Sequence, residues 1–421
     1  MQKILKVFIF IIILSSIPAP KVRAEEVLTW KDCIRQALKN HPDLISAQEE
    51  INQSVASKEI TKSSLLPQVS VSAGVSTEKS STQSSSTKSY DYGASASQLI
   101  FDGFKTTDQI QAASESIKAT REAYRFTSSE IRLRLRTAFI NLLRAQQMLK
   151  VAEDILKIRR NNLILISLRY ESGLEHKGAL LTAEANVAQA KLEIDKAKRN
   201  LEVSQVQLAK EMGLATFEPF SVEGNFVVKR EEKPDFGLIA KNSSSVKQLI
   251  FQKNAARYGI KSAYAEFFPQ ISGQFGTSRT DEHFPPSISR WDAGLSLSWP
   301  IFEGGLKTAQ VKQAESLFRQ FQAIERSTKD SVVLNLEDTW AALEDSVETA
   351  DVQKKFLDAA EERSKISEAQ YSLGLIQFDN WTIIEDDLVR NKKSLLDAEA
   401  NVLLAEANWI QAKGATLEYV E

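Results

Sequence analysis

Apolar and polar residues alternate along four short stretches of the chain. In the first stretch, the apolar side carries Val69, Val71, Ala73 and Val75. The opposite side carries Gln68, Ser70, Ser72 and Gly74. A period of two residues is typical of a β-strand with one apolar face. The pattern predicts strands at about 67–79, 90–101, 269–279 and 290–301.

The predicted strands fit two structures. Strands of about 9 to 11 residues with one apolar face suit a transmembrane β-barrel. A pair of hairpins in a soluble protein would show a similar alternation. The strand pattern alone leaves both structures open.

Between the strand pairs, the hydrophobic period changes to that of long helices. From Asp102 to Leu168 the chain has no proline, and Gly103 is its only glycine. A helix of this length would span about 100 Å. Its apolar positions step by four and three residues through Ile131, Leu135, Ala138, Leu142, Ala145, Leu149, Ala152 and Leu156. The same stepping follows in Ala183, Val187, Ala190, Ile194, Ala197, Leu201, Ser204 and Leu208, and in Val332, Leu336, Thr339, Leu343, Ser346 and Ala350. A seam of 3.5 residues predicts long helical hairpins packed as coiled coils.

The chain contains an internal duplication. The sequence LLPQVSVSAG at 65–74 is echoed by FFPQISGQFG at 267–276, and IFDG at 100–103 by IFEG at 301–304. The offset is 201 or 202 residues, far longer than the period of solenoid repeats. Two large copies, each a strand pair followed by a helical hairpin, therefore make one architecture.

A short motif recurs where each predicted hairpin reverses. YESGL at 170–174 matches YSLGL at 371–375. Gly173 and Gly374 stand where a glycine commonly ends a helix in the left-handed conformation. Tyr170 and Tyr371 precede them by about one turn. The motif fits either a helix cap with an aromatic side chain packed on it or a contact that holds neighbouring tips together.

The N-terminal residues predict export from the cytoplasm. Lys3 and Lys6 precede an apolar run from Val7 to Leu14, and Ala24 offers a cleavage site. This pattern predicts a signal peptide at 1–24, and no cysteine follows the expected cleavage that could carry a lipid. The single cysteine, Cys33, is expected to fill a small helical position rather than to act as a nucleophile.

Composition and motifs argue against catalysis. With 53 basic and 55 acidic residues the formal net charge is −2, which gives no indication of nucleic-acid binding. The three histidines, His41, His176 and His283, have no metal-ligand spacing. No glycine-rich phosphate loop is present. We expect no enzyme activity, cofactor or metal site.

The open edges of the strands predict an assembly. Four strands cannot span a bilayer alone, because their edges would leave backbone groups unpaired in hydrocarbon. Two chains would supply eight strands, and a barrel of that size is filled by its own side chains. If the strands span a membrane, a trimer with twelve strands is the smallest conduit.

Taken together, these features resemble the TolC family of outer-membrane efflux proteins. The resemblance covers nearly the whole mature chain and rests on LTWKDCIRQALKNHPDL at 28–44, the LLPQ/FFPQ and IFDG/IFEG pairs, and the two Tyr-x-x-Gly tips. It implies a mainly α fold with a β-barrel part: a trimeric twelve-stranded barrel continued by an α-helical tunnel. It also implies partners, namely a periplasmic membrane-fusion adaptor and an inner-membrane transporter of RND, ABC or MFS type, with the barrel in contact with outer-membrane lipid.

The resemblance divides the chain into four parts. They are the signal peptide 1–24, a first repeat 25–213 with a hairpin at 102–213, a mixed equatorial region 214–264, and a second repeat 265–421 with a hairpin at 303–414 and a short tail.

The resemblance also implies that the tips close the periplasmic entrance. The family tyrosine that takes part in this closure matches Tyr371, and the family often carries a ring of aspartates near Asn380 and Ile383. Here the nearby carboxylates are Asp379, Asp386 and Asp387, so an acidic ring is either shifted or absent. For Glu385 to Asp387 a solvated helix face is the favoured interpretation. Carboxylates converging from three chains would instead raise one another's pKa values and attract cations.

Two other classes of protein stay open on the sequence: a periplasmic coiled-coil adaptor, and a structural periplasmic protein whose strands do not enter a membrane. An adaptor is expected to have a single hairpin in a lipoyl-like module, whereas this chain has two hairpins and two strand pairs. The exported substrate is not encoded in any motif we find.

Overall fold

The computed structural model describes residues 26–79, 86–226, 228 and 232–419. The expected signal peptide at 1–24 and residues 80–85, between the first two predicted strands, lie outside the described residues.

Four long helices dominate the chain, and their lengths reveal the duplication. Helices α3 (Lys105–Glu171) and α7 (Leu306–Ser372) have 67 residues each. The returning helices α4 (Lys177–Glu211) and α8 (Phe378–Ala412) have 35 residues each. The remaining length of α3 and α7 packs against shorter helices, α2 (Pro42–Ser63) and α6 (Ser244–Ala265), of 22 residues each.

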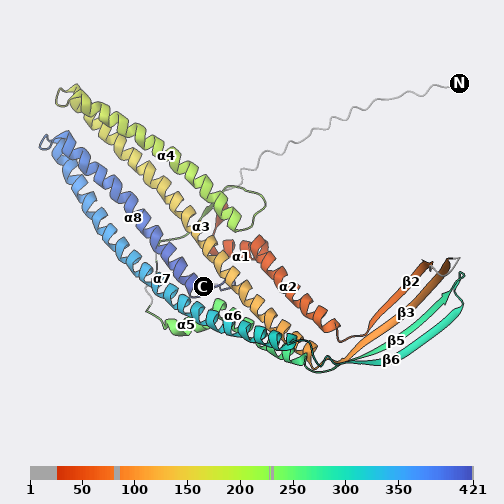
Figure 1. Cartoon of the computed structure of the whole chain (residues 1–421). Coiled ribbons are helices and arrows are strands. Elements are labelled where there is room, and N and C mark those ends of the chain that lie inside the picture. Colours follow the sequence, from red (N-terminus) through yellow and green to blue (C-terminus); the bar gives the residue numbers. More distant parts are fainter. Residues whose placement is uncertain (1–25, 80–85, 227, 229–231, 420–421) are drawn as a thin grey trace, which may run out of the picture.

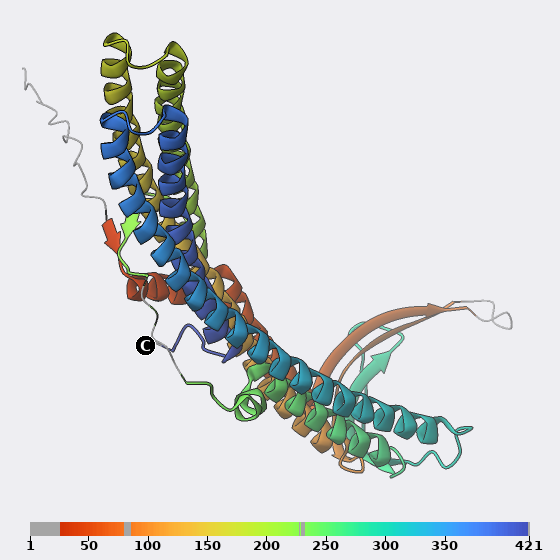
Figure 2. The ribbon, with the colours of Figure 1, turned by 90° about the vertical axis from the view of Figure 1, so that its left-hand side faces the viewer.

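The molecule is elongated, with its helical tips and its sheet at opposite ends (Figure 1). The α3–α4 and α7–α8 hairpins lie side by side in both views, and each reverses at the end remote from the strands (Figures 1 and 2). Among the described residues, no helix is long and apolar enough to cross a membrane.

The predicted heptad seam forms the interface between the long helices. Ile131, Leu135, Leu142 and Ala145 are at most 1 % exposed in α3. In α4, Ala183, Val187 and Ala190 are buried, and in α7 Leu336 and Leu343 are. Small alanine side chains let neighbouring helices approach closely, while the leucines fill the space between them.

The strands form one antiparallel sheet in the order β2–β3–β5–β6. Their bounds are β2 (Gln68–Glu78), β3 (Thr87–Phe101), β5 (Gln270–Asp281) and β6 (Ile288–Ser298). β2 and β6 are the edge strands. The β3–β5 pairing joins the first internal repeat to the second, with Ala96 opposite Phe275.

One face of this sheet is apolar and uncovered. Val71 on β2 is 81 % exposed and Leu295 on β6 is 77 % exposed. The register places these residues on the same face as Phe275 and Trp291, whereas serines, glycines and glutamines occupy the other face. In water such a face would be costly, because each buried CH₂ group gains about 0.8 kcal/mol on leaving water.

The main core lies at the middle of the molecule, where α1 (Trp30–Asn40), α3, α4 and α8 meet. Thr29 caps α1 through a reciprocal capping box with Asp32. Cys33 lies in this core with 0 % exposure, and burial raises the pKa of its thiol to about 12. This position confirms the expectation of a packing residue.

A short strand pair and a second core complete the middle region. β1 (Glu26–Leu28) pairs in parallel with β4 (Phe220–Val222). Helix α5 (Phe236–Asn242) packs on α7 and α8, where the rings of Trp340 and Trp409 lie 5.1 Å apart.

Candidate functional site: the tips of the two helical hairpins

Each hairpin tip is a helix C-terminus closed by a glycine. Gly173 and Gly374 have φ values of 72° and 77°, in the left-handed region that favours glycine. At the first tip, the backbone N–H groups of Gly173 and Leu174 donate to Tyr170 O (3.0 Å) and Arg169 O (2.8 Å). Matching bonds close the second tip. These paired bonds form the Schellman motif, and they confirm the cap interpretation of the two glycines.

Tyr371 is the centre of a cluster that joins the two tips. Its side chain is 0 % exposed and its ring stacks on Trp381 of α8, with ring centroids 4.3 Å apart. Its hydroxyl donates a hydrogen bond of 2.7 Å to Glu175, which belongs to the first tip. The guanidinium of Arg169, also from the first hairpin, lies 4.7 Å from the centre of the Tyr371 ring.

Arg169 also bonds to the backbone of the second tip. It donates to the carbonyl oxygens of Tyr371 (3.1 Å) and Ser372 (3.3 Å) in the last turn of α7. The Tyr371 carbonyl thus accepts both from Arg169 and from the capping N–H of Gly374. Its Nε lies 4.0 Å from Glu175. Burial, followed by the hydrogen bond to the Glu175 carboxylate, raises the pKa of Tyr371 well above its usual value. The phenol is therefore neutral and remains a hydrogen-bond donor at physiological pH.

The two equivalent tyrosines have different surroundings. Tyr170 is 38 % exposed and lies outside the cluster of buried side chains around Tyr371. A Cβ atom added at Gly374 would lie 4.0 Å from Nη2 of Arg169, whereas a Cβ atom added at Gly173 would meet nothing within 4 Å. The duplication thus places matching residues at both tips, but only Tyr371 lies between the hairpins.

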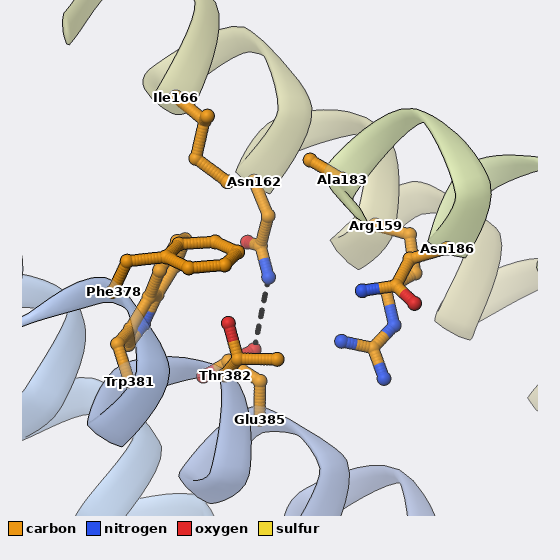
Figure 3. Close-up of a pocket in the computed structure, with 9 residues that line it drawn as sticks. All are labelled: Arg159, Asn162, Ile166, Ala183, Asn186, Phe378, Trp381, Thr382 and Glu385. Atoms are coloured by element: carbon orange, nitrogen blue, oxygen red, sulfur yellow. Dashed lines mark hydrogen bonds between the residues drawn. The ribbon is translucent and has the colours of Figure 1, made fainter. Parts of the chain in front are cut away.

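A polar interface continues along the helices away from the tips. Glu385 of α8 is 3 % exposed and accepts a hydrogen bond from Ser364 of α7 (2.5 Å). It also accepts a hydrogen bond from Asn162 of α3 (3.3 Å; Figure 3). The neighbouring Asp386 pairs with Arg159 of α3, whose side chain is largely buried. Both carboxylates therefore link the second hairpin to the first.

These contacts correct one sequence-based interpretation. Glu385 to Asp387 were expected to form a solvated helix face, and for Glu385 this is wrong. Asp387 is ion-paired with Arg363 of α7 (3.7 Å) and Arg390 (3.0 Å). The sequence did not indicate the burial of Glu385, because its partners Ser364 and Asn162 belong to other helices. Asp379 and Asn380 are exposed in the first turn of α8.

A small cavity lies between the two hairpins, where α3 and α4 face α8 beside Glu385. It has a volume of about 10 Å³ and is lined by Arg159, Asn162, Ile166, Ala183, Asn186, Phe378, Trp381, Thr382 and Glu385 (Figure 3). Such a volume has room for about one water molecule. The cavity is far too small for a transported substrate.

Several members of this site were not singled out from the sequence. Arg169, Glu175 and Trp381 contact Tyr371, and Asn162 and Ser364 contact Glu385. The only sequence indication for Arg169 and Glu175 is their position directly flanking the YESGL motif. Among the residues that the structure describes, no group of three or more His, Cys, Asp and Glu side chains could hold a metal ion.

Solved structures share the fold over nearly the whole chain. A crystal structure of CusC superposes with a TM-score of 0.82 at 20 % identity, covering 91 % of this chain and 91 % of that one. The open state of the Neisseria gonorrhoeae MtrE outer membrane channel gives a TM-score of 0.80 at 19 % identity, covering 92 % and 89 %. This likeness confirms the expected fold of helical hairpins with a β part.

Sequence comparison gives relatives of the same kind. Outer membrane efflux protein BepC of Brucella suis is 20 % identical over 402 residues, covering 92 % of this chain and 85 % of the relative. Outer membrane protein TolC of Escherichia coli K12 is 23 % identical over 411 residues, covering 90 % and 79 %. The family model "Outer membrane efflux protein" matches residues 33–214 and 237–415. The chain therefore belongs to the outer membrane efflux protein family, and is a channel protein of the outer membrane rather than a periplasmic adaptor.

Proposed function

We propose that three copies of this chain form one conduit, with a twelve-stranded barrel in the outer membrane and a periplasmic tunnel of twelve long helices. The conduit is a passive exit duct: an inner-membrane transporter selects the substrate, and a periplasmic adaptor connects the two. The chain itself has no catalytic role. Family members act as trimers with an adaptor and a transporter.

The observation that carries this proposal is the single-layer sheet with two free edges. β2 and β6 each lack a partner on one side within the described chain. Their outward face is apolar and exposed, with Val71, Leu295 and Trp291 at 75 % exposure or more. A sheet with such a face can enter hydrocarbon only when its edges are paired. Pairing β6 of one copy with β2 of the next closes a ring and covers both edges.

We propose further that the Tyr371 cluster keeps the periplasmic entrance closed. Tyr371, Arg169 and Glu175 join the tips of the two hairpins of one chain, so the second hairpin can move away from the first only when these contacts break. Asp386 and Glu385 add a second set of contacts nearer the middle of the helices. Gly173 and Gly374 shape the tips, while Tyr170, Asp379 and Asn380 stay available to a neighbouring copy or to the adaptor.

Three classes of inner-membrane transporter fit the proposed conduit. The relative CusC of Escherichia coli is a cation efflux system protein. For this chain an RND, ABC or MFS transporter would serve equally, because the conduit needs only an adaptor that fits its tips.

The test is conductance in a planar bilayer, with the oligomeric state measured on the same preparation. We expect protein extracted from outer membranes to have the mass of a trimer and to produce discrete steps that rest mostly at low conductance. A monomer that needs no detergent, together with silent bilayers, would refute the proposed conduit.

A further inference from the structure

The outward face of the sheet carries two cationic side chains near its outer end. Arg279 on β5 lies directly opposite Tyr92 on β3, and Lys88 lies opposite Thr77 on β2. The register gives both residues the same face as Val71, Phe275 and Leu295. This face is otherwise apolar along most of its length.

The connections of the strands show at which end of the sheet Arg279 and Lys88 lie. The helices leave the sheet at the end marked by Gln68 and Phe101, and the hairpin loop that starts after Asp281 closes the opposite end. With the helices in the periplasm, Arg279 and Lys88 lie towards the external surface. Tyr90 and Tyr92 accompany them, which is the aromatic girdle expected where hydrocarbon meets headgroups.

Both cations lie on the two central strands of the sheet. Neighbouring copies in a closed barrel would pair with the edges β2 and β6, so β3 and β5 keep their outward face towards lipid. The carboxylate of Asp281, on the same face, is bonded to the hydroxyl and N–H of Ser287 and to the N–H of His283. It is therefore committed to the loop rather than to Arg279.

The remaining carboxylates of the four strands lie on the opposite face of the sheet. Glu78, Asp91 and Asp292 fall on the lumen side, together with the serines and glycines. Asp91 and Asp292 lie over Gly74 and Gly276 of the adjacent strand, where an added Cβ would approach their oxygens to 2.8 and 2.5 Å. The outward face is thus left with a net cationic rim above its apolar band.

From this arrangement we infer that Arg279 and Lys88 bind the phosphate groups of an outer-leaflet lipid. An arginine presents a planar set of donors that matches phosphate, and a lysine supplies a point charge on a flexible stem. The two residues are four positions apart along neighbouring strands, a separation of about 13 Å at the rise of a β-strand. Their long side chains can therefore hold two phosphate groups of one headgroup, with the acyl chains against the apolar band. The inference rests on the membrane-spanning barrel proposed above.

The chain offers a matched control on the opposite face. Arg290 of β6 lies opposite Ser278, one residue from Arg279 along β5, but its register points it towards the lumen. Replacing Arg290 removes the same charge at the same height of the barrel without touching the lipid face.

The experiment is native mass spectrometry of the detergent-extracted trimer, titrated with diphosphorylated lipid A or with the same lipid after dephosphorylation. We expect the phosphorylated lipid to bind more tightly, and Arg279→Gln and Lys88→Gln each to weaken its binding about fivefold. Arg290→Gln should bind like the wild type, and Arg279→Lys should retain most of the binding. Equal binding of the dephosphorylated lipid, or undiminished binding in the Arg279→Gln/Lys88→Gln double variant, would overturn the inference.

Conductance of the same variants separates this inference from the conduit itself. Arg279→Gln trimers should still give wild-type conductance steps, because the residue faces lipid rather than the lumen. Normal conductance with unchanged lipid binding would refute only the lipid site. Loss of the trimer and of conductance in the wild-type protein would refute the barrel, and the lipid site with it.

Discussion

The hydroxyl of Tyr371 donates a 2.7 Å hydrogen bond to Glu175, 196 residues away in the sequence, and this bond joins the tips of the two hairpins. The carboxylate of Glu175 is nearly buried and also faces Arg169. Removing the phenol hydroxyl leaves this carboxylate short of a donor in a poorly hydrated position. One of the contacts between the tips therefore depends on a single oxygen atom, and removing that atom leaves the shape of the aromatic side chain nearly unchanged.

We predict that Tyr371→Phe increases the time the channel spends open. A hydrogen bond to a charged group contributes about 1.5–3 kcal/mol, so the ratio of open to closed states should rise by roughly tenfold or more. Tyr170→Phe is the matched control, because Tyr170 occupies the equivalent position but lies outside the buried cluster. Single-channel recording of both variants measures the effect. Equal open probability in the two variants would contradict a closing role for Tyr371.

The raised pKa of Tyr371 predicts a response to alkali. Its pKa lies above the ordinary value of 10.0 in the folded protein, because burial and the Glu175 carboxylate both disfavour the phenolate. The phenol's contribution to tip stability is therefore complete below about pH 10 and is lost as the pH rises through the folded-state pKa. The difference in tyrosinate absorbance between wild type and Tyr371→Phe should show one late-titrating tyrosine. A difference spectrum that titrates at the ordinary value would show that Tyr371 is not held in this environment.

Glu385 should be more important for hairpin association than its exposed neighbours. Glu385→Ala leaves Ser364 and Asn162 without their acceptor in a buried interface, and we expect a loss of about 1–3 kcal/mol in stability. Glu385→Gln keeps one acceptor oxygen and should lose less. Glu362→Ala, on an exposed face of α7, is the control and should be nearly neutral. Thermal unfolding of the three variants in detergent gives the order; a neutral Glu385→Ala would show that the buried bonds contribute nothing net.

The structure shows which parts of this site depend on local sequence. Gly173 and Gly374 were predictable because a helix end requires a left-handed residue within the same few positions. The seam through Leu135 and Leu142 was predictable because its period is a property of one helix. The Tyr371–Glu175 bond was not, since neither residue indicates which distant side chain it meets. Glu385 was misjudged for the same reason: its partners belong to α3 and α7.

Cys33 should resist thiol reagents as long as the main core around α1 is intact. The side chain is fully buried, and burial raises the pKa of the thiol to about 12, so almost no thiolate exists at pH 8. Maleimide labelling followed by mass spectrometry should detect no adduct in the folded protein and a single adduct after denaturation. Rapid labelling of the native trimer would contradict the packing of α1 in this core.

The C-terminal tail, residues 415–419, should detach from α3 when the pH falls below about 4.5. Tyr124 and Ser128 donate to the Glu418 carboxylate at 3.2 and 2.9 Å. Burial alone would raise the pKa of Glu418, but hydrogen bonds from Thr416, its own backbone N–H, Ser128 and Tyr124 outweigh burial and hold it below the usual 4.5. Because the folded-state pKa is lowered, this stabilisation is present above about pH 4.5 and is lost as the pH falls through the folded-state pKa.

Hydrogen exchange of residues 415–419 as a function of pH measures this detachment. In the wild type, protection should be high at pH 7 and should fall on acidification below the usual glutamate pKa. Glu418→Gln removes the charge at every pH, so its tail should be less protected at pH 7 and should change little in acid. If the variant and the wild type lose protection in parallel, another carboxylate controls the tail. Protection that persists in acid in both proteins would instead identify Arg132 as the stronger attachment, because it bonds to the carbonyl oxygens of Thr416 and Tyr419 and its charge does not change over this range.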